Sequence, residues 1–315
     1  MTNFWKGKKI VVTGASGFIG NAFVNALSQK PCHIIAIISP HVDITRLKKI
    51  SKKNVVFLAK DLLKESLDEL EDVDMLFNFA AFDAGYEFKK SHSADLFDVN
   101  IKLSLNVLKS VIQAKIPLLV QMSSIDVYPK SLGREVVEED ALSIEELLPN
   151  GYAMAKRTIE QVGHIYSHQF GTKIITVRAA NIYGPGDKMQ SDRVRAVQSF
   201  VNQALTTNKI AIKGNAGFTI PLLYVGDFVD GLIRLIEKTQ EPNIYTFANP
   251  RPVSLGEVAQ AIKKQLPKTE IEISANEQVT ITYDTKKLKS VIGEFAKTSL
   301  DDGVAETIRY TKKVL

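Results

Sequence analysis

The feature that most constrains the fold is a glycine-rich loop between a strand and a helix near the beginning of the sequence. Residues 9–13 form a short, β-branched run, Gly14-x-x-Gly17-x-x-Gly20 follows it directly, and residues 18–29 have helical spacing of their apolar side chains. The first glycine permits a tight turn, the second a close approach to a pyrophosphate, and the third close packing of helix on strand. A loop of this kind in this place predicts a βαβ unit and a dinucleotide-binding site.

The alternation of strands and helices continues through the first half of the chain. Apolar runs predict strands at residues 33–38, 55–59, 75–79, 118–122 and 174–178, and helical spacing predicts long helices at 94–114 and 152–170. Gly171 is a natural end for the second helix. This alternation is typical of a parallel sheet with helices on both faces. We therefore expect an α/β fold, a doubly wound parallel sheet of the Rossmann type, over residues 1–178 and about 211–249.

The rhythm changes after residue 178, where a turn-rich segment begins. Helical patterns at 193–206 and 255–265, strand patterns at 271–273 and 279–281, and a final helix predict a smaller lobe. We expect this discontinuous lobe, about 179–210 and 250–315, to bind substrate. Two further patterns, an apolar run at 222–225 and a helix at 227–237, fall in the returning segment of the first domain.

Composition excludes several classes of protein. The one cysteine, Cys32, cannot form an internal disulfide, which suits a reducing compartment. No apolar stretch approaches the length of a membrane span, and the run at 10–12 is too short for a signal peptide. The net charge of +5 comes from small scattered groups of lysines without an aromatic-interleaved basic stripe, so solvated helix faces are favoured over nucleic-acid binding. The alternative explanation of the net positive charge is that it attracts an anionic cofactor or substrate. We expect a cytoplasmic protein without a nucleic-acid or membrane partner.

Three side chains predict the chemistry of the site. Tyr152 and Lys156 lie four residues apart and so share one face of the second long helix. A nearby cation lowers the pKa of a phenol, which can then exchange a proton with a substrate oxygen while hydride moves to or from a nicotinamide. Ser124 ends the fifth strand, where a hydroxyl can stabilise a developing oxyanion. If Tyr152 were absent, a structural role for this serine, in which its hydroxyl hydrogen-bonds the backbone of a turn, would be as well supported as the catalytic role.

These motifs resemble the extended short-chain dehydrogenase family, also called the NAD-dependent epimerase/dehydratase family. The matching segments, in order, are Thr13-Gly-x-x-Gly-Phe-Ile-Gly20, Ser123-Ser-x-x-Val-Tyr128, Tyr152-x-x-x-Lys156, Asn181-Ile-Tyr-Gly-Pro185, Tyr224-Val-Gly-Asp227 and Leu300-Asp-Asp-Gly303. The resemblance implies an NAD(P)-dependent enzyme that acts on a nucleotide-linked sugar. It also implies a homodimer formed through the helices at 94–114 and 152–170.

The resemblance assigns further residues by their positions. It implies that Asp61 and Leu62 flank the adenine, that Asn100 supports the site and that Asn181 faces the substrate. The other cofactor-binding positions that it implies, besides Tyr152 and Lys156, are Gly14, Ser16, Gly17, Phe18, Ile19, Gly20, Phe79, Ala80 and Ala81.

The catalytic segment is most similar to that of GDP-fucose synthase-like nucleotide-sugar reductases. That group places a cysteine two residues after the catalytic serine and a histidine after its Asn-x-Tyr-Gly-Pro motif, whereas this sequence has Asp126 and Gln190. The hydride-transfer set is complete. Asp126 matches the carboxylate that removes a sugar C5 proton in the dehydratase branch, although it also suits a surface group or a ligand of a substrate hydroxyl.

The residues expected to hold the substrate diphosphate depart from the family pattern. Ile220 stands where family members that act on nucleotide sugars often carry an arginine, and a second, C-terminal arginine is also missing. Arg193 and Arg195 are candidates for the replacement, and a solvated helix face is the alternative reading.

The end of the second strand bears on the choice of cofactor. NAD-preferring enzymes usually place a carboxylate there against the ribose 2′-hydroxyl. Here the position is near Ser39, followed by His41 and Arg46, which could hold a 2′-phosphate. Asp43 is farther along the loop. NADP is therefore favoured over NAD.

The reaction itself stays open between three readings. Reduction of a 4-keto sugar is the first, and epimerisation or 4,6-dehydration with a retained cofactor is the second. A non-catalytic NAD(P)-binding regulator is the third, and the presence of Ser124, Tyr152 and Lys156 argues against it. His164 and His168 could pair on a metal, but no third ligand accompanies them, so no metal site is expected.

Overall fold

The computed structural model describes residues 4–42, 53–83, 86–129, 132, 134–147, 149–187, 195–275 and 277–315. A seven-stranded parallel sheet is its centre, with the strand order β11-β6-β5-β4-β1-β2-β3. This order reverses at β1, as in doubly wound dinucleotide-binding sheets. The strands are β1 (Lys9–Thr13), β2 (His33–Ile38), β3 (Val55–Ala59), β4 (Met75–Asn78), β5 (Leu118–Ser124), β6 (Lys173–Ala179) and β11 (Asn243–Phe247). The expected fold class is confirmed.

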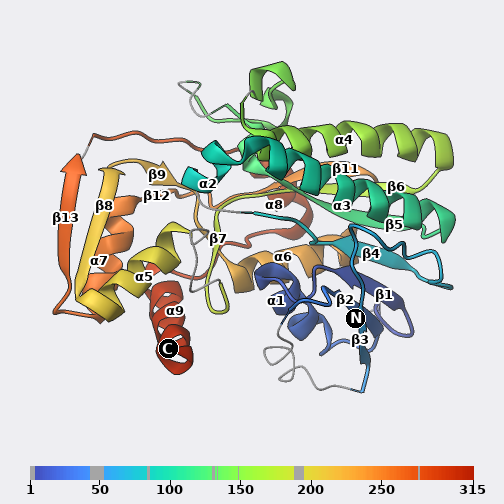
Figure 1. Cartoon of the computed structure of the whole chain (residues 1–315), viewed down its shortest axis with the longest axis horizontal. Helices are drawn as coiled ribbons and strands as arrows, with labels where there is room; N and C mark the ends of the chain where they lie inside the picture. The colour runs from blue at the N-terminus through green and yellow to red at the C-terminus, as the bar shows by residue number, and fades with distance from the viewer. Residues whose placement is uncertain are drawn as a thin grey trace.

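Helices cover both faces of this sheet (Figure 1). On one face, α3 (Ser93–Gln113) and α4 (Gly151–Phe170) pack on a core that includes Val107, Val111 and Ile159. On the other face lie α1 (Phe18–Leu27), α6 (Val225–Lys238) and α8 (Lys286–Ile292), whose cluster includes Phe23 and Phe228. Burial on both sides explains why the central strands are almost continuously apolar.

The second lobe lies at the opposite end of the molecule from β1, β2 and β3 (Figure 1). It has its own core, which joins the helices α5 (Ala196–Thr207), α7 (Leu255–Gln265) and α9 (Leu300–Val314) to strand β8 (Lys209–Asn215). Strand β8 pairs in parallel with β13 (Glu270–Ala275), although the two lie far apart in the sequence. Short pairs of strands connect the lobes: β7 (Ile182–Tyr183) with β10 (Leu223–Tyr224), and β9 (Thr219–Ile220) with β12 (Val253–Ser254).

The predicted elements agree with the structure in most places. The helix predicted at 152–170 is α4, and it ends at Gly171 in a left-handed conformation with φ of +75°. The strand pattern at 279–281 was wrong, because Val279 forms only an isolated bridge with Phe218. Strands β8 and β11 and the short helices α2 (Tyr86–Ser91) and α8 were missed. The division into domains near residue 211 stays a prediction, and the core shared by β8 and α5 favours a boundary after β8.

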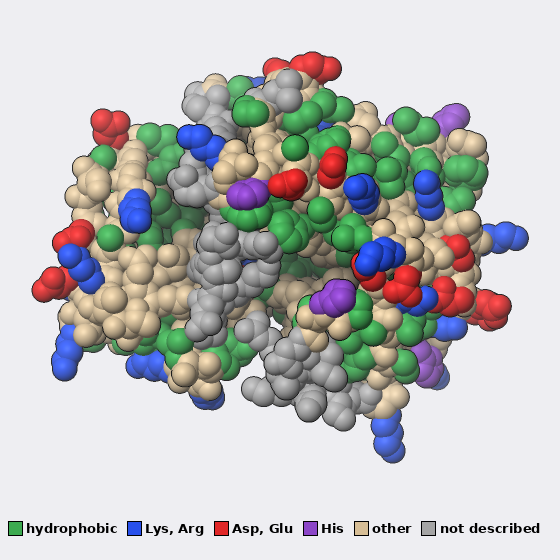
Figure 2. Space-filling view, viewed as in Figure 1, with side chains coloured by type: hydrophobic (Ala, Val, Ile, Leu, Met, Phe, Trp, Pro, Cys, Tyr) green, Lys and Arg blue, Asp and Glu red, His purple; other side chains and the backbone are tan. Residues whose placement is uncertain are grey.

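Two surface properties follow from the same structure. Lys and Arg side chains are interspersed with acidic ones on the face shown in Figure 2, and no basic stripe is visible there. Across the ranges that the structure describes, no helix combines the length and apolar character that crossing a bilayer requires.

Candidate active site

A cavity of about 860 Å³ opens at the carboxyl ends of the central strands. The glycine loop, the end of β5, the first turns of α4 and the start of α5 contribute to its wall. Ligands bind at this edge of doubly wound sheets, where the strand order reverses. Twelve expected site residues are in the lining: Gly14, Gly17, Phe18, Ile19, Gly20, Phe79, Ala81, Ser124, Asp126, Tyr152, Lys156 and Asn181.

The glycine loop has the geometry that a dinucleotide pyrophosphate requires. Gly14 adopts a φ of +65°. A Cβ there would lie 2.6 Å from the backbone nitrogen of Ala80, which follows the neighbouring strand β4. A Cβ at Gly20 would overlap the Gly14 carbonyl oxygen. Helix α1 begins after Gly17 without a side-chain cap and without an acidic residue in its first turn. Its N-terminal N–H groups and positive dipole therefore suit a phosphate, and the loop fits NAD(P).

Tyr152 and Lys156 lie in the first turns of α4, on the side that lines the cavity. Asn150 caps this helix, since its side-chain oxygen accepts a hydrogen bond from the backbone N–H of Ala153 at 3.1 Å. The Lys156 ammonium donates to the Met122 carbonyl oxygen at 3.1 Å and lies 5.6 Å from the centre of the Tyr152 ring. Both side chains are buried, with 7% and 2% of the residue exposed. The helix therefore presents the phenol and the ammonium together to the cavity.

Burial changes the pKa of both groups. It lowers the pKa of the Lys156 ammonium to about 8, because a charge is costly in an apolar environment. It raises the pKa of the Tyr152 phenol, and Asp83 adds to this increase while Lys89 opposes it. A nearby cation does lower the phenol's pKa, but burial outweighs it, so the expectation of a net lowered pKa is wrong for Tyr152. Tyr152 is protonated at neutral pH and is ready to donate a proton.

Ser124 ends β5 and begins a 3₁₀ turn, η3 (Ile125–Val127). Its hydroxyl oxygen accepts a hydrogen bond from the backbone N–H of Asp126 at 3.1 Å. Since that bond occupies only an acceptor position, the hydroxyl proton can still be donated to a substrate oxygen. Next to it, the hydroxyl of Ser123 is buried and has no partner among the described residues, and it lies in the cavity wall. Both serines can serve a bound ligand.

A cluster of charges lies beside Tyr152. The Lys89 ammonium, from α2, is 2.8 Å from Oδ2 of Asp126 and 3.1 Å from Oδ1 of Asp83. It also lies 4.0 Å from the centre of the Tyr152 ring, a cation–π distance. Burial alone would lower the pKa of Lys89, but Asp126 and Asp83 outweigh it and raise the value. Lys89 is therefore a cation under all ordinary conditions.

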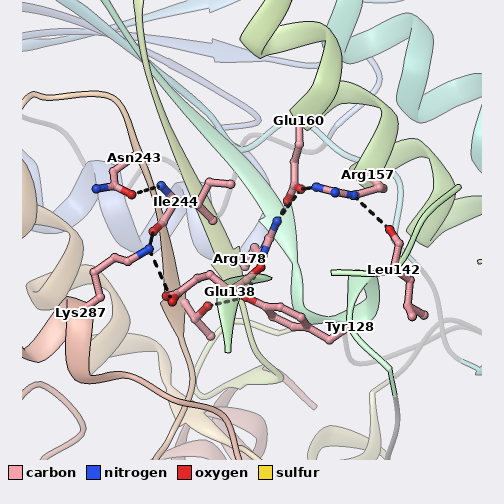
Figure 3. Close-up of polar contacts among 10 residues, drawn as sticks. Tyr128, Glu138, Leu142, Arg157, Glu160, Arg178, Asn243, Ile244 and Lys287 are labelled. Atoms are coloured by element: carbon pink, nitrogen blue, oxygen red, sulfur yellow. Dashed lines mark hydrogen bonds and ion pairs between the residues drawn. The ribbon is translucent and has the colours of Figure 1, made fainter. Parts of the chain in front are cut away.

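A second charged network, behind the cavity wall, holds the segment that follows Ser124 (Figure 3). Arg178, on β6, donates two hydrogen bonds of 2.9 Å to the carboxylate of Glu160 on α4. The same guanidinium donates to the Tyr128 hydroxyl at 3.0 Å and to the Glu138 carbonyl oxygen at 2.6 Å. Arg157 also donates to Glu160, at 2.9 Å. The network thus ties α4, β6 and the chain after η3 together.

Comparison with known proteins agrees with this geometry. The sequence model of the NAD dependent epimerase/dehydratase family matches residues 10–248, which is most of the chain. The chain belongs to that family.

Proteins named for reactions of nucleotide sugars are among those similar to this chain. A dTDP-4-dehydro-6-deoxy-D-allose reductase from a Streptomyces species is 29% identical over 97% of each chain. A GDP-L-fucose synthase from Sinorhizobium fredii is 25% identical over 81% of this chain and 79% of its own length. The structure of a UDP-N-acetylglucosamine 4-epimerase from Methanobrevibacter ruminantium, in complex with UDP-N-acetylmuramic acid, superimposes with a TM-score of 0.86 at 19% identity, covering 98% of this chain and 100% of that one.

Several positions that the family pattern implied lie outside the cavity wall. Asn100 binds the backbone instead: its side chain accepts from the N–H of Phe82 and donates to the Phe82 carbonyl oxygen, each at 3.0 Å. It therefore supports the loop after β4. The other described positions that do not line the cavity are Ser16, Ser39, Asp61, Leu62 and Ala80. Arg46, Asp43, Gln190 and Arg193 lie outside the described residues.

Other members of the cavity wall were not expected from the sequence. They include Asp83, Lys89, Asn150 and Asp187. Asp83 and Lys89 follow β4, and the rule that loops at the carboxyl ends of parallel strands line the site could have found them. Arg195, a candidate for the diphosphate, does line the cavity, and its guanidinium is paired with Asp187 at 2.6 Å. His164 and His168 are exposed on α4, and within the described ranges no group of three His, Cys, Asp or Glu side chains could hold a metal.

Proposed function

We propose that this family member is an NADPH-dependent reductase of a nucleotide-linked 4-keto sugar. The observation that carries the proposal is that Tyr152, Lys156 and Ser124 line one cavity together with the glycine loop. A reductase must give a proton to the carbonyl oxygen, so a phenol with a raised pKa suits that direction. The relative that reduces a dTDP-4-dehydro-6-deoxy sugar supports the same substrate class.

The chain's own residues account for the proton side of this reaction. NADPH, when bound, supplies a hydride to the C4 carbon of the sugar. The Ser124 hydroxyl donates a hydrogen bond to the C4 oxygen and stabilises the negative charge that develops there. Tyr152 then gives its proton to that oxygen, and the Lys156 ammonium stabilises the phenolate that is left. Solvent returns a proton to Tyr152 before the next cycle.

A second candidate is an epimerase or 4,6-dehydratase with a retained cofactor. The observation in its favour is Asp126, a carboxylate in the cavity wall two residues after Ser124. Such enzymes must remove a carbon-bound proton from the sugar, in addition to moving a hydride. The ion pair of Asp126 with Lys89 argues against that role, because it occupies one carboxylate oxygen.

The experiment that separates the candidates is turnover in D₂O with a 4-keto nucleotide sugar. We expect one NADPH oxidised for each sugar reduced and no deuterium at C3 or C5 of the product by NMR. Recycling of the cofactor without net oxidation, or deuterium at C5 that disappears in Asp126→Asn, would favour the second candidate. Binding of cofactor without turnover of any keto sugar would indicate a regulator.

The preference for NADP over NAD is part of the proposal. The support is the end of β2, where the exposed Ser39 and His41 stand and residues 39–42 hold no carboxylate. A 2′-phosphate would meet no repulsion from that segment.

We also propose that two copies of the chain pair through α3 and α4 and that they work in the cytoplasm. These helices lie side by side on one face of the sheet (Figure 1). On α4, Ile165 and Phe170 are 60% and 49% exposed, which suits a surface that a second copy covers. The only cysteine, Cys32, is a buried free thiol, as a reducing compartment allows.

A further inference from the structure

Lys89 has a position in the cavity that its sequence context does not explain. It belongs to the short helix α2, and only 21% of its side chain is exposed. Its ammonium bridges the carboxylates of Asp83 and Asp126 and faces the Tyr152 ring. The adjacent Lys90 is exposed. Lys89 is therefore held between two carboxylates, one on each side of its ammonium.

The bridge changes what Asp126 can do. Its Oδ2 is 2.8 Å from the Lys89 ammonium, which is the distance of a strong, charge-assisted hydrogen bond. That oxygen cannot accept a proton from a sugar carbon until the ammonium moves away. The backbone N–H of Asp126 is held as well, since it donates to Ser124. The carboxylate is thus fixed in the cavity wall beside Ser124, with one of its oxygens engaged by a cation.

We propose that Lys89 is a specificity-determining residue: by engaging Asp126 it suppresses proton abstraction from the sugar and restricts the site to hydride transfer. This inference rests on the proposed function, because it needs a 4-keto sugar in the cavity. The proposal predicts that the site catalyses proton abstraction from C5 of the sugar once the ion pair between Lys89 and Asp126 is removed.

The suppressed step is a simple enolisation. The C5–H bond breaks, its proton goes to a carboxylate oxygen of Asp126, and its electron pair forms a C4–C5 double bond. The C4 oxygen takes the displaced carbonyl electrons and becomes an enolate, which Ser124 and Tyr152 can stabilise. When the carboxyl group has exchanged with D₂O, the reverse step leaves deuterium at C5. No oxidant or reductant is consumed.

Helix α2 has support that does not depend on Lys89. The Phe88 ring stacks on His92, with centroids 4.1 Å apart, and contacts Phe82 at 6.1 Å. Removal of the ammonium should therefore leave the helix in place. Without the ammonium, the carboxylates of Asp83 and Asp126 repel each other and could move apart. A second variant that also replaces Asp83 by asparagine removes this repulsion.

The test measures C5 exchange with the oxidised cofactor bound, so that no reduction competes. Each protein is incubated with NADP⁺ and a dTDP-4-keto-6-deoxy sugar in D₂O, and the loss of the C5 proton signal is followed by NMR. We expect exchange in Lys89→Met, and in Lys89→Met with Asp83→Asn, to be about 10²-fold faster than in the wild type, which is the scale of a released general base. Adding Asp126→Asn should return exchange to the wild-type rate.

Two controls make the result specific. Lys89→Arg keeps the cation and should keep exchange slow. Lys263→Met removes an exposed lysine from α7, outside the cavity wall, and should change neither exchange nor turnover. Wild-type exchange in both Lys89→Met variants, or fast exchange that survives Asp126→Asn, would overturn the role of Lys89. If the wild type oxidises NADPH with none of the keto sugars, the proposed function fails instead, so the two failures are distinguishable.

Discussion

The ion pair between Arg178 and Glu160 allows a quantitative prediction. Glu160→Gln keeps the size of the side chain but removes its charge, and it leaves the Arg178 guanidinium, of which 1% is exposed, without a counter-ion. Loss of one partner from a buried pair costs about 3–5 kcal/mol. Because the glutamine oxygen can still accept one of the two 2.9 Å bonds, we expect a loss near the lower end, about 3 kcal/mol.

The assay is urea unfolding at pH 7, with Glu241→Gln as a matched control. Glu241 also pairs with a cation, Lys173, but the side chains are 75% and 46% exposed. An exposed pair contributes about 0–1 kcal/mol, so the control should unfold almost as the wild type does. Replacing Glu160 and Arg178 together by methionine should recover part of the loss, since Arg178 is then not left as an unpaired buried charge, although Arg157 still loses its carboxylate partner. A loss below about 1 kcal/mol in Glu160→Gln would refute the reasoning.

Three further predictions concern the chemistry. Tyr152→Phe should lower kcat by at least about 10²-fold with little change in the cofactor Kd, because it removes only the proton carrier; near-normal turnover would contradict the assignment. NADPH should bind at least as tightly as NADH in a calorimetric titration, and a clear preference for NADH would mean that an acid reaches the ribose. The rate of reduction should fall as the pH rises through about 8, because Lys156 then loses its charge. Lys156→Arg should move that fall to higher pH, since a guanidinium stays charged, and an unchanged pH profile would assign it to another group.

The parts of the fold that could be predicted from the sequence are those with local signals. The glycine loop, the apolar central strands and the long helix that carries Tyr152 each have a pattern within a short window. Strand β8 was missed although Ile210 and Ile212 alternate as buried residues, because the apolar run is short and its partner β13 lies far along the sequence. The pairing of Val279 with Phe218 is likewise decided by tertiary packing. Local patterns therefore misplaced the strand at 279–281 and did not reveal β8 and β11.

The site divides in the same way. Tyr152, Lys156 and Ser124 were found because helical spacing and strand ends place them on one side of the sheet. Lys89 was missed because it lies on a short helix, α2. Its place after β4 indicates only that it is near the cavity, and nothing in the sequence shows that its ammonium would reach Asp126. The direction of the Tyr152 pKa was also wrong, because burial is a property of the packed site and outweighs the neighbouring cations.

The position of β11 in the sheet has a consequence for biosynthesis. Strand β11 pairs with β6 in register from Asn243↔Ile175 to Phe247↔Ala179. Residues 180–242 are therefore synthesised after β6 and before the strand that pairs with it. Until residue 247 leaves the ribosome, β6 presents an open, apolar edge to solvent. Unpaired edges of this kind are where nascent chains aggregate or recruit chaperones. A truncation before β11 should therefore yield insoluble protein even though every residue of the glycine loop, Tyr152 and Lys156 is already present.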